Sequence, residues 1–187
     1  MRILLATLIA APLLAGCVTE QASLGSGKLA DWEASAAREP EAGSLHAMAR
    51  LYASQGRDEQ AEATLRELVG KAPDFLPAYE ELARLYVKRD LLDGAIAALE
   101  LGLQHHDRDP VLLNDLGLCR LLQKDLAAAA EAFTRAAAAS ADDTRARSNL
   151  ALVLGLMGRD DEALALWRQV LPAAEAAANL ARVAQAR

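Results

Sequence analysis

Residues 76–109 read LPAYEELARLYVKRDLLDGAIAALELGLQHHDRD, and residues 110–143 read PVLLNDLGLCRLLQKDLAAAAEAFTRAAAASADD. The two stretches have the same length and place similar residues at the same points, and the match extends in both directions along the chain at a step of 34 residues. Four columns of residues follow this step: Ala61, Ala95, Ala129 and Ala163; Leu65, Leu99, Phe133 and Trp167; Met48, Leu82, Leu116 and Leu150; and Ala49, Ala83, Gly117 and Ala151. Internal repetition with such a period is typical of a solenoid built from one structural unit.

Each repeated unit is predicted to form two helices joined by a tight turn. Ala and Leu, which favour helices, dominate the sequence, and aromatic residues make up only 4% of it. An all-β fold is therefore excluded. The turn between the two helices carries Gly56, Asp90, Lys124 and Gly158. Glycine or a short polar residue can end a helix there in a left-handed conformation, and Lys124 fits this requirement least well.

The unit resembles the tetratricopeptide repeat, because a large apolar residue, then Gly or Ala, a tight turn, Ala and an aromatic residue follow one another at the period of that family. The resemblance covers residues 42 to about 171 and divides them into four units, 42–75, 76–109, 110–143 and 144–171. It implies an all-α, right-handed superhelical solenoid of about four helix pairs, with a concave groove lined by the first helix of each pair. Because the ends of a solenoid need a cap, residues 172–187 are expected to form a C-terminal capping helix. The last unit departs from the family pattern at Arg147, which replaces a large apolar residue.

The N-terminus reads MRILLATLIAAPLLAGC over residues 1–17. One basic residue, Arg2, precedes an uncharged run that is too short to span a bilayer as a helix, which is the pattern of a secretory signal peptide. The run ends in Leu-Ala-Gly-Cys at residues 14–17, and these four residues resemble the lipobox of bacterial lipoproteins. The resemblance implies that the signal peptide, residues 1–16, is cleaved and that the Cys17 thiol carries a covalent lipid. The alternatives are an ordinary secretory signal in which Cys17 is incidental and a membrane anchor that is not cleaved.

The residues after the lipobox indicate where the protein is held. Val18 follows the cysteine, whereas lipoproteins retained in the inner membrane typically carry Asp there, so the resemblance implies an outer-membrane protein that faces the periplasm. Residues 17–27 comprise the lipidated cysteine and a tether that is rich in Ser and Gly, which favours flexibility. Residues 28–41 are a candidate N-terminal half-unit helix with apolar residues along one face.

In the tetratricopeptide family, ligands usually lie along first-helix residues that are not needed for packing. By this resemblance the groove residues are His46 and Arg50 in the first unit; Glu80, Arg84, Val87 and Lys88 in the second; Asn114, Leu118, Leu121 and Leu122 in the third; and Ser148, Leu152 and Leu156 in the fourth. The N-terminal half of this lining is charged, and Arg50 and Arg84 occupy equivalent positions from which they can pair with carboxylates. The C-terminal half offers leucines, which suit an amphipathic helix or an extended peptide.

Two other interpretations of these residues stay open. The leucines can be buried beneath the C-terminal helix, since leucine at helical spacing is commonly a core residue; those affected are Leu118, Leu121, Leu152 and Leu156. Arg50 and Arg84 can be solvated residues that form weak local ion pairs. The two-carboxylate clamp of chaperone-binding family members requires Lys and Asn where this chain has His46 and Arg50, so a chaperone-tail receptor is not expected.

Charge and motif content argue against nucleic-acid binding and catalysis. The chain has 20 basic and 26 acidic residues, interspersed to a net charge of −6, and lacks the concentrated basic face that nucleic acid requires. No metalloprotease, serine-hydrolase, paired-cysteine or phosphate-loop motif occurs. A metal-assisted hydrolase is the enzymatic alternative, centred on His105 and His106, but adjacent histidines point in different directions and a solvated loop is favoured.

Cys119 lies in an apolar column and is expected to be a buried, unreactive thiol. Apart from the lipid, no cofactor or metal is expected.

A lipobox joined by a short tether to a small set of these repeats resembles the TadD-type lipoproteins of tight-adherence (Flp) pilus assembly, and is similar to pilotin-like lipoproteins of type IV pilus systems. The resemblance implies a non-enzymatic protein that binds a partner protein in its groove and assists the assembly or localisation of a pilus or secretion machine. An outer-membrane secretin is the partner it suggests. The alternative is an envelope adaptor lipoprotein that recruits proteases or peptidoglycan enzymes.

Overall fold

The computed structural model describes residues 41–187, and these residues form nine helices and no strand. The helices are α2 (Ala42–Ser54), α3 (Asp58–Lys71), α4 (Leu76–Lys88), α5 (Leu92–His105), α6 (Pro110–Leu122), α7 (Leu126–Ala139), α8 (Thr144–Leu156), α9 (Asp160–Val170) and α10 (Ala173–Gln185). None of the helices in this part of the chain is long and apolar enough to cross a membrane. The signal peptide, Cys17, the tether and the N-terminal half-unit were predicted for residues that lie outside the described part.

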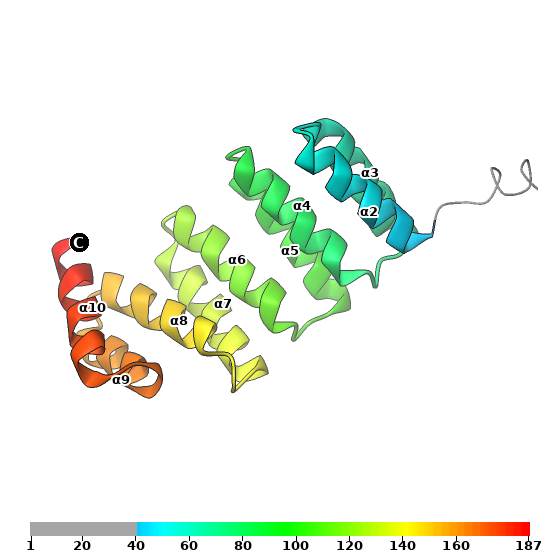
Figure 1. Cartoon of the computed structure of the whole chain (residues 1–187). Helices are drawn as coiled ribbons and strands as arrows, with labels where there is room; N and C mark the ends of the chain where they lie inside the picture. Colours follow the sequence, from blue (N-terminus) through cyan, green and yellow to red (C-terminus); the bar gives the residue numbers. More distant parts are fainter. Residues whose placement is uncertain (1–40) are drawn as a thin grey trace, which may run out of the picture. The chain divides into compact units, whose positions relative to one another are not determined.

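The helices pack in chain order as the pairs α2/α3, α4/α5, α6/α7 and α8/α9, and successive pairs stack against one another (Figure 1). The first helices of the pairs begin at Ala42, Leu76, Pro110 and Thr144, so each begins 34 residues after the previous one. α10 packs on both helices of the last pair and caps the C-terminal end of the stack. The all-α fold of repeated helix pairs with a C-terminal capping helix is confirmed.

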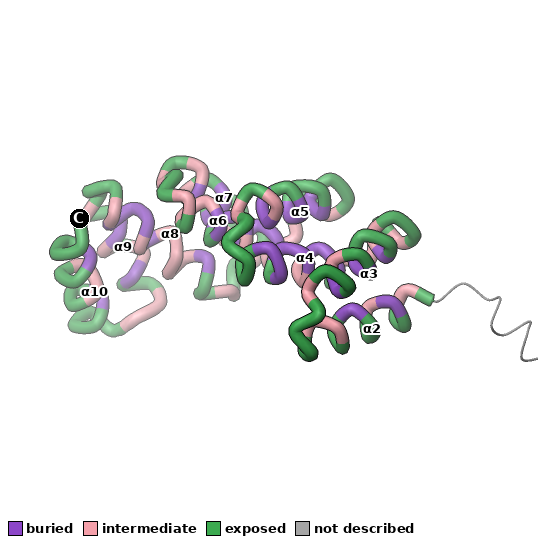
Figure 2. Tube along the Cα trace, turned by 90° about the horizontal axis from the view of Figure 1, so that it is seen from above, coloured by how far each residue is buried: buried purple, intermediate pink, exposed green. Residues whose placement is uncertain are grey.

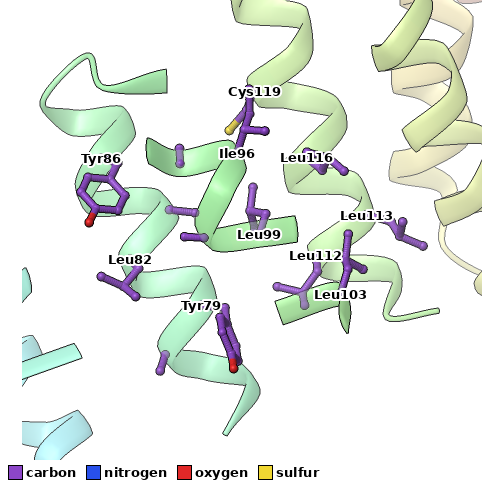
Figure 3. Packing of buried hydrophobic residues seen from close by; sticks show 14 of the residues in the cluster. Tyr79, Leu82, Tyr86, Ile96, Leu99, Leu103, Leu112, Leu113, Leu116 and Cys119 are labelled. Atoms are coloured by element: carbon purple, nitrogen blue, oxygen red, sulfur yellow. The ribbon is translucent and has the colours of Figure 1, made fainter. Parts of the chain in front are cut away.

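Most residues of the columns that the 34-residue period defines belong to the core. Figure 2 shows buried residues on the faces that the helices turn toward their neighbours, with exposed residues on the outside. Leu65, Leu99, Phe133 and Trp167, which share one column, are all buried. Figure 3 shows Leu99 among the buried side chains of α4, α5 and α6. Each second helix thus buries the large side chain of this column within the stack, and no pair can cover its apolar face alone.

Tyr79 fixes the junction of three helices. Its side chain is fully buried, and its hydroxyl donates a hydrogen bond of 2.7 Å to the Pro73 carbonyl oxygen in the preceding loop. A Cβ atom on Gly102 of α5 would lie 2.8 Å from the Tyr79 ring and 2.9 Å from Leu112 of α6. The absence of a side chain at Gly102 therefore lets α4, α5 and α6 approach closely.

The tight turns within the pairs all use a left-handed residue at the equivalent position. The angle φ is +72° at Gly56, +58° at Asp90, +64° at Lys124 and +79° at Gly158. This conformation brings Cβ close to the following carbonyl oxygen and costs about 1–2 kcal/mol for a residue with a side chain. The second and third turns therefore form despite their residues, because the packing of the flanking helices determines the backbone.

Replacing Lys124 by glycine is expected to stabilise the protein by about 1 kcal/mol, because glycine removes the steric cost of the positive φ and loses part of that gain to its greater freedom when unfolded. The free energy of unfolding in urea measures the change. Ala97→Gly, at an exposed position in the middle of α5, is the control and should destabilise by about 1 kcal/mol. Equal destabilisation by both substitutions would show that the turn at Lys124 carries no strain.

Candidate partner-binding groove

The first helices α2, α4 and α6 form a surface with two hollows, and this surface is called the groove below. The N-terminal hollow, between α2 and α4, has a volume of about 270 Å³ and is lined by Ala49, Arg50, Ala53, Ala61, Leu65, Glu81, Arg84, Leu85 and Lys88. The central hollow, between α4 and α6, has a volume of about 340 Å³ and is lined by Ala83, Arg84, Val87, Asp115, Leu118, Cys119, Leu121 and Leu122. Arg84 borders both hollows, so they are adjacent parts of one surface.

The N-terminal hollow has a charged rim above an apolar floor. Arg84 forms an ion pair of 2.8 Å with Glu81 one helical turn earlier on α4. Arg50, from α2, lies 3.9 Å from the other oxygen of the same carboxylate. Lys88 is paired at 2.8 Å with Asp58 at the start of α3. The side chains of both arginines stay about two-thirds exposed, so these pairs contribute little to stability and leave the guanidinium groups accessible.

The central hollow is mainly apolar. Leu122 is 57% exposed, and Leu118 and Val87 are exposed by more than a third. Leu121 is half-buried and packs against the small cluster around Phe133. Large apolar side chains exposed together around a hollow are typical of a surface that another molecule covers.

Two carboxyl groups near the central hollow have raised pKa values. Burial is the main cause of the raised pKa of Asp115, and the hydrogen bond from Asn114 and the charges of Arg84 and Arg145 oppose it. Burial also raises the pKa of Glu80, and the nearby charge of Asp115 adds to that effect. This part of the groove is therefore a poor place for a further negative charge.

Asn114 does not lie open to a ligand, contrary to its predicted place in the groove. Only 8% of it is exposed, and its amide oxygen accepts a hydrogen bond of 2.9 Å from Asn149 of α8. Its amide nitrogen is 3.4 Å from the Asp115 carboxylate. The side chain thus joins two neighbouring first helices, which the position of Asn114 on its own helix does not reveal.

The predicted residues of the fourth unit also lie differently. Leu152 and Leu156 are half-buried and pack against the cluster that includes Trp167 of α9 and Val183 of α10. The alternative of burial beneath the C-terminal helix therefore describes these two leucines, whereas Leu118 and Leu121 line the central hollow. Ser148 is half-buried.

His46 is half-buried at the start of the groove. Its ring packs edge-on against Phe75, with 5.3 Å between the ring centroids. The predicted groove residues that line the two hollows are thus Arg50, Arg84, Val87, Lys88, Leu118, Leu121 and Leu122.

Two charged residues of the groove were not predicted from the sequence. Glu81 lies on the rim of the N-terminal hollow and contacts both arginines, and Asp115 lies on the rim of the central hollow. The two residues are 34 positions apart and share a column with Asn149. Glu81 and Asp115 each directly follow a predicted groove residue, Glu80 and Asn114, and this repeated position could have identified them from the sequence.

Cys119 lies at the floor of the central hollow and is 3% exposed. Burial raises the pKa of its thiol to about 11, so the thiol stays protonated throughout the neutral range.

Alkylation of Cys119 by iodoacetamide at pH 8 is expected to be about 100-fold slower in the folded protein than in urea, because a rise of two pKa units lowers the thiolate fraction by that factor. A Cys17→Ser background leaves a single thiol, and mass spectrometry follows its modification. Similar rates in the folded and unfolded states would contradict the burial of this thiol.

The histidine pair lies at the C-terminal end of α5, where His105 is the last helical residue and His106 follows it. His105 stacks on Tyr79, with 6.4 Å between ring centroids. His106 Nε2 lies 3.2 Å from the Asp74 carbonyl oxygen, in the loop between α3 and α4. Within residues 41–187 these histidines are not part of a group of three or more metal-binding side chains.

Comparisons with known proteins agree with this fold. A family model described as tetratricopeptide repeat matches residues 42–85.

Several solved structures have a similar fold. The crystal structure of MamA protein is similar to this chain, with 18% identity, 77% of this chain and 81% of that chain covered, and a TM-score of 0.67. YrrB, described as a tetratricopeptide-repeat protein with an unusual peptide-binding site, has 23% identity, 76% of each chain covered and a TM-score of 0.62. PilF from Pseudomonas aeruginosa has 21% identity, 76% of this chain and 67% of that chain covered, and a TM-score of 0.63. No curated protein sequence matched the chain. The fold is that of a tetratricopeptide-repeat solenoid.

Proposed function

We propose that this chain is a non-enzymatic outer-membrane lipoprotein that holds a partner protein in its groove. The observation that carries the proposal is the pair of adjacent hollows on α2, α4 and α6, where exposed apolar and cationic side chains occur together. A surface of this kind is suited to a segment of another protein. The solved structure of YrrB, which has a similar fold, is described with a peptide-binding site, and this supports a peptide or protein partner.

The lipobox supports the membrane location. A lipid on Cys17 and the short polar tether of residues 18–27 would keep residues 41–187 on the periplasmic side, within a few nanometres of the outer membrane. Several acyl chains together make such an anchor effectively permanent, whereas one chain binds only marginally. We therefore place partner capture at the membrane surface.

The combination of lipobox, tether and a few repeats supports a role in the assembly or localisation of a pilus or secretion machine, such as the Flp pilus, with an outer-membrane secretin as the partner. An adaptor that recruits proteases or peptidoglycan enzymes has the same architecture. The identity of the captured protein separates the two roles.

Photo-crosslinking in intact cells tests capture by the groove. A benzophenone amino acid at Leu122, in the central hollow, should crosslink to a partner that mass spectrometry identifies. The same amino acid at Leu101 is the matched control, because Leu101 is also an exposed leucine (39%) but lies on a second helix, α5. A secretin crosslinked from position 122 alone supports the pilus or secretion role, and an envelope protease or peptidoglycan enzyme supports the adaptor role. Equal products from both positions would place the binding surface elsewhere.

The anchor has its own test. Cys17→Ser should leave the precursor unprocessed and remove the chain from the outer-membrane fraction, because position 17 then has no thiol to accept the lipid. Normal processing and normal fractionation of this variant would contradict the lipoprotein assignment.

A further inference from the structure

We infer that the groove selects a partner segment with two features: a large apolar side chain for the central hollow and a carboxylate for the N-terminal hollow. The inference rests on the proposed function, since it assumes that the groove holds a partner, and it adds the chemistry of the segment that is held.

The apolar feature follows from the central hollow. Val87, Leu118 and Leu122 surround it and are exposed by 36%, 39% and 57%, and the hollow is large enough to take a side chain. The leucines at the equivalent positions of the fourth unit, Leu152 and Leu156, are already packed against the cluster shared with α10. An apolar side chain in the central hollow would thus cover leucines that the fold itself leaves uncovered.

The acidic feature follows from the charges around the N-terminal hollow. Its lining contains three cations, Arg50, Arg84 and Lys88, and one anion, Glu81, in a chain whose net charge is −6. Lys88 is paired with Asp58 outside the lining. The local excess of positive charge therefore rests on the two arginines, which share one carboxylate.

The Glu81 carboxylate lies closer to one arginine than to the other. Glu81 is 2.8 Å from Arg84 but 3.9 Å from Arg50, whose side chain is 68% exposed. A carboxylate from a partner can reach Arg50 without breaking the closer pair, and Arg–carboxylate hydrogen bonds are among the strong ones. The central hollow is unsuited to the same group, because Asp115 lies on its rim and Glu80 is close by.

The spacing of the two features follows from the helices. Neighbouring packed helices lie about 8–10 Å apart, and the two hollows lie on opposite sides of α4. A segment in the polyproline II conformation rises about 3.1 Å per residue and presents every third side chain on the same face. The carboxylate and the apolar side chain should therefore be three residues apart in a segment of this conformation.

Synthetic peptides test this chemistry. Fluorescein-labelled ten-residue Ser/Gly peptides would carry Glu and Leu three residues apart, in either order, and their binding to the purified full chain would be measured by anisotropy at low salt. Replacing Glu by Lys, or Leu by Ser, should weaken binding by about tenfold or more, which corresponds to the loss of one charge-assisted hydrogen bond or one apolar anchor.

Variants of the protein make the test specific. Arg50→Glu should reverse the preference, so that the Lys/Leu peptide binds more tightly than the Glu/Leu peptide. Leu118→Asp should abolish binding, and Leu101→Asp, at a leucine with the same exposed fraction on α5, should leave it unchanged. Circular dichroism and urea unfolding check that each variant is folded.

Three outcomes would overturn the inference: equal binding of the Glu/Leu and Lys/Leu peptides, an unchanged preference in Arg50→Glu, or no binding of any peptide at millimolar concentration. In each case the crosslink from position 122 in cells still reports separately whether the groove captures a protein. The proposed function and the chemistry inferred for its partner can thus fail independently.

Discussion

Replacing Gly117 by alanine is expected to destabilise the protein by about 2 kcal/mol, although alanine is the better helix former. Gly117 lies within α6, and a Cβ atom there would be 2.6 Å from Cε1 and 2.7 Å from Cδ1 of Phe133. Phe133 is fully buried, so its ring has no free space into which to move. Urea unfolding measures the loss.

The expected effect depends on one partner, because the equivalent pairs in the first two units combine alanine with leucine: Ala49 with Leu65, and Ala83 with Leu99. Phe133→Leu should therefore make Gly117→Ala neutral or stabilising, since the clash is removed and the helix propensity of alanine remains. The double-mutant cycle should give a favourable coupling of about 2 kcal/mol between the two substitutions.

Gly70→Ala is the matched control for this pair. Gly70 is also within a helix, α3, but no atom lies within 4 Å of a Cβ placed there. This substitution should stabilise the protein by about 0.5–1 kcal/mol. If Gly117→Ala stabilised the protein as Gly70→Ala does while Phe133 is still present, the inferred close packing of α6 on Phe133 would be contradicted.

The same column also shows why the fourth unit tolerates alanine opposite a larger aromatic residue. Ala151 is paired with Trp167, and Gly155 stands where the third unit has Leu121. The Trp167 ring reaches to 3.7 Å from a Cβ placed on Gly155. In the third unit the equivalent position is filled by Leu121, which packs against the Phe133 cluster. The Phe133 ring therefore occupies the space next to Gly117 instead.

The fold could be predicted from the sequence because its information is periodic. Many residues 34 positions apart, such as Leu65 and Leu99, have the same environment, so most columns of the sequence correspond to buried columns of the structure. The left-handed turn at Lys124 was also predictable from register, because Gly56 and Gly158 occupy the same position, although lysine itself disfavours that conformation.

The groove was predictable only in part, because accessibility depends on the neighbouring helices. Asn114 was assigned to the groove from its place in the repeat, but its side chain is buried and accepts a hydrogen bond from Asn149 of the next first helix. Leu152 and Leu156 pack against the cluster that includes α10, so their accessibility depends on a helix outside their own unit. Arg50 and Arg84 were recognised, whereas the carboxylate of Glu81 that they share was identified only when α2 and α4 were seen together.

Replacing Trp167 by alanine is expected to cost about 3–5 kcal/mol and to act only on the C-terminal end of the chain. Trp167 is 3% exposed within a cluster formed by α8, α9 and α10, to which Ala176 and Val183 of the capping helix belong. The large core cluster is built mainly from α2 to α7 and does not include Trp167. Because each solenoid unit contacts only its neighbours, the disruption should stay local.

Hydrogen exchange measured by mass spectrometry distinguishes local from global loss. In Trp167→Ala, the amides of α9 and α10 should lose most of their protection, and those of α4 and α5 should keep it. Tyr79→Ala is the counterpart, because Tyr79 is fully buried in the large cluster and its removal also costs about 3–5 kcal/mol. It should expose α4, α5 and α6 to exchange.

The two variants should also separate in function, since the groove hollows are formed by α2, α4 and α6. Trp167→Ala should retain partner crosslinking from position 122, and Tyr79→Ala should lose it. Uniform loss of protection from α2 to α10 in either variant would mean that the stack unfolds as one cooperative unit. In that case the capping helix α10 would be as necessary for partner capture as the groove helices themselves, because no part of the stack could stay folded without it.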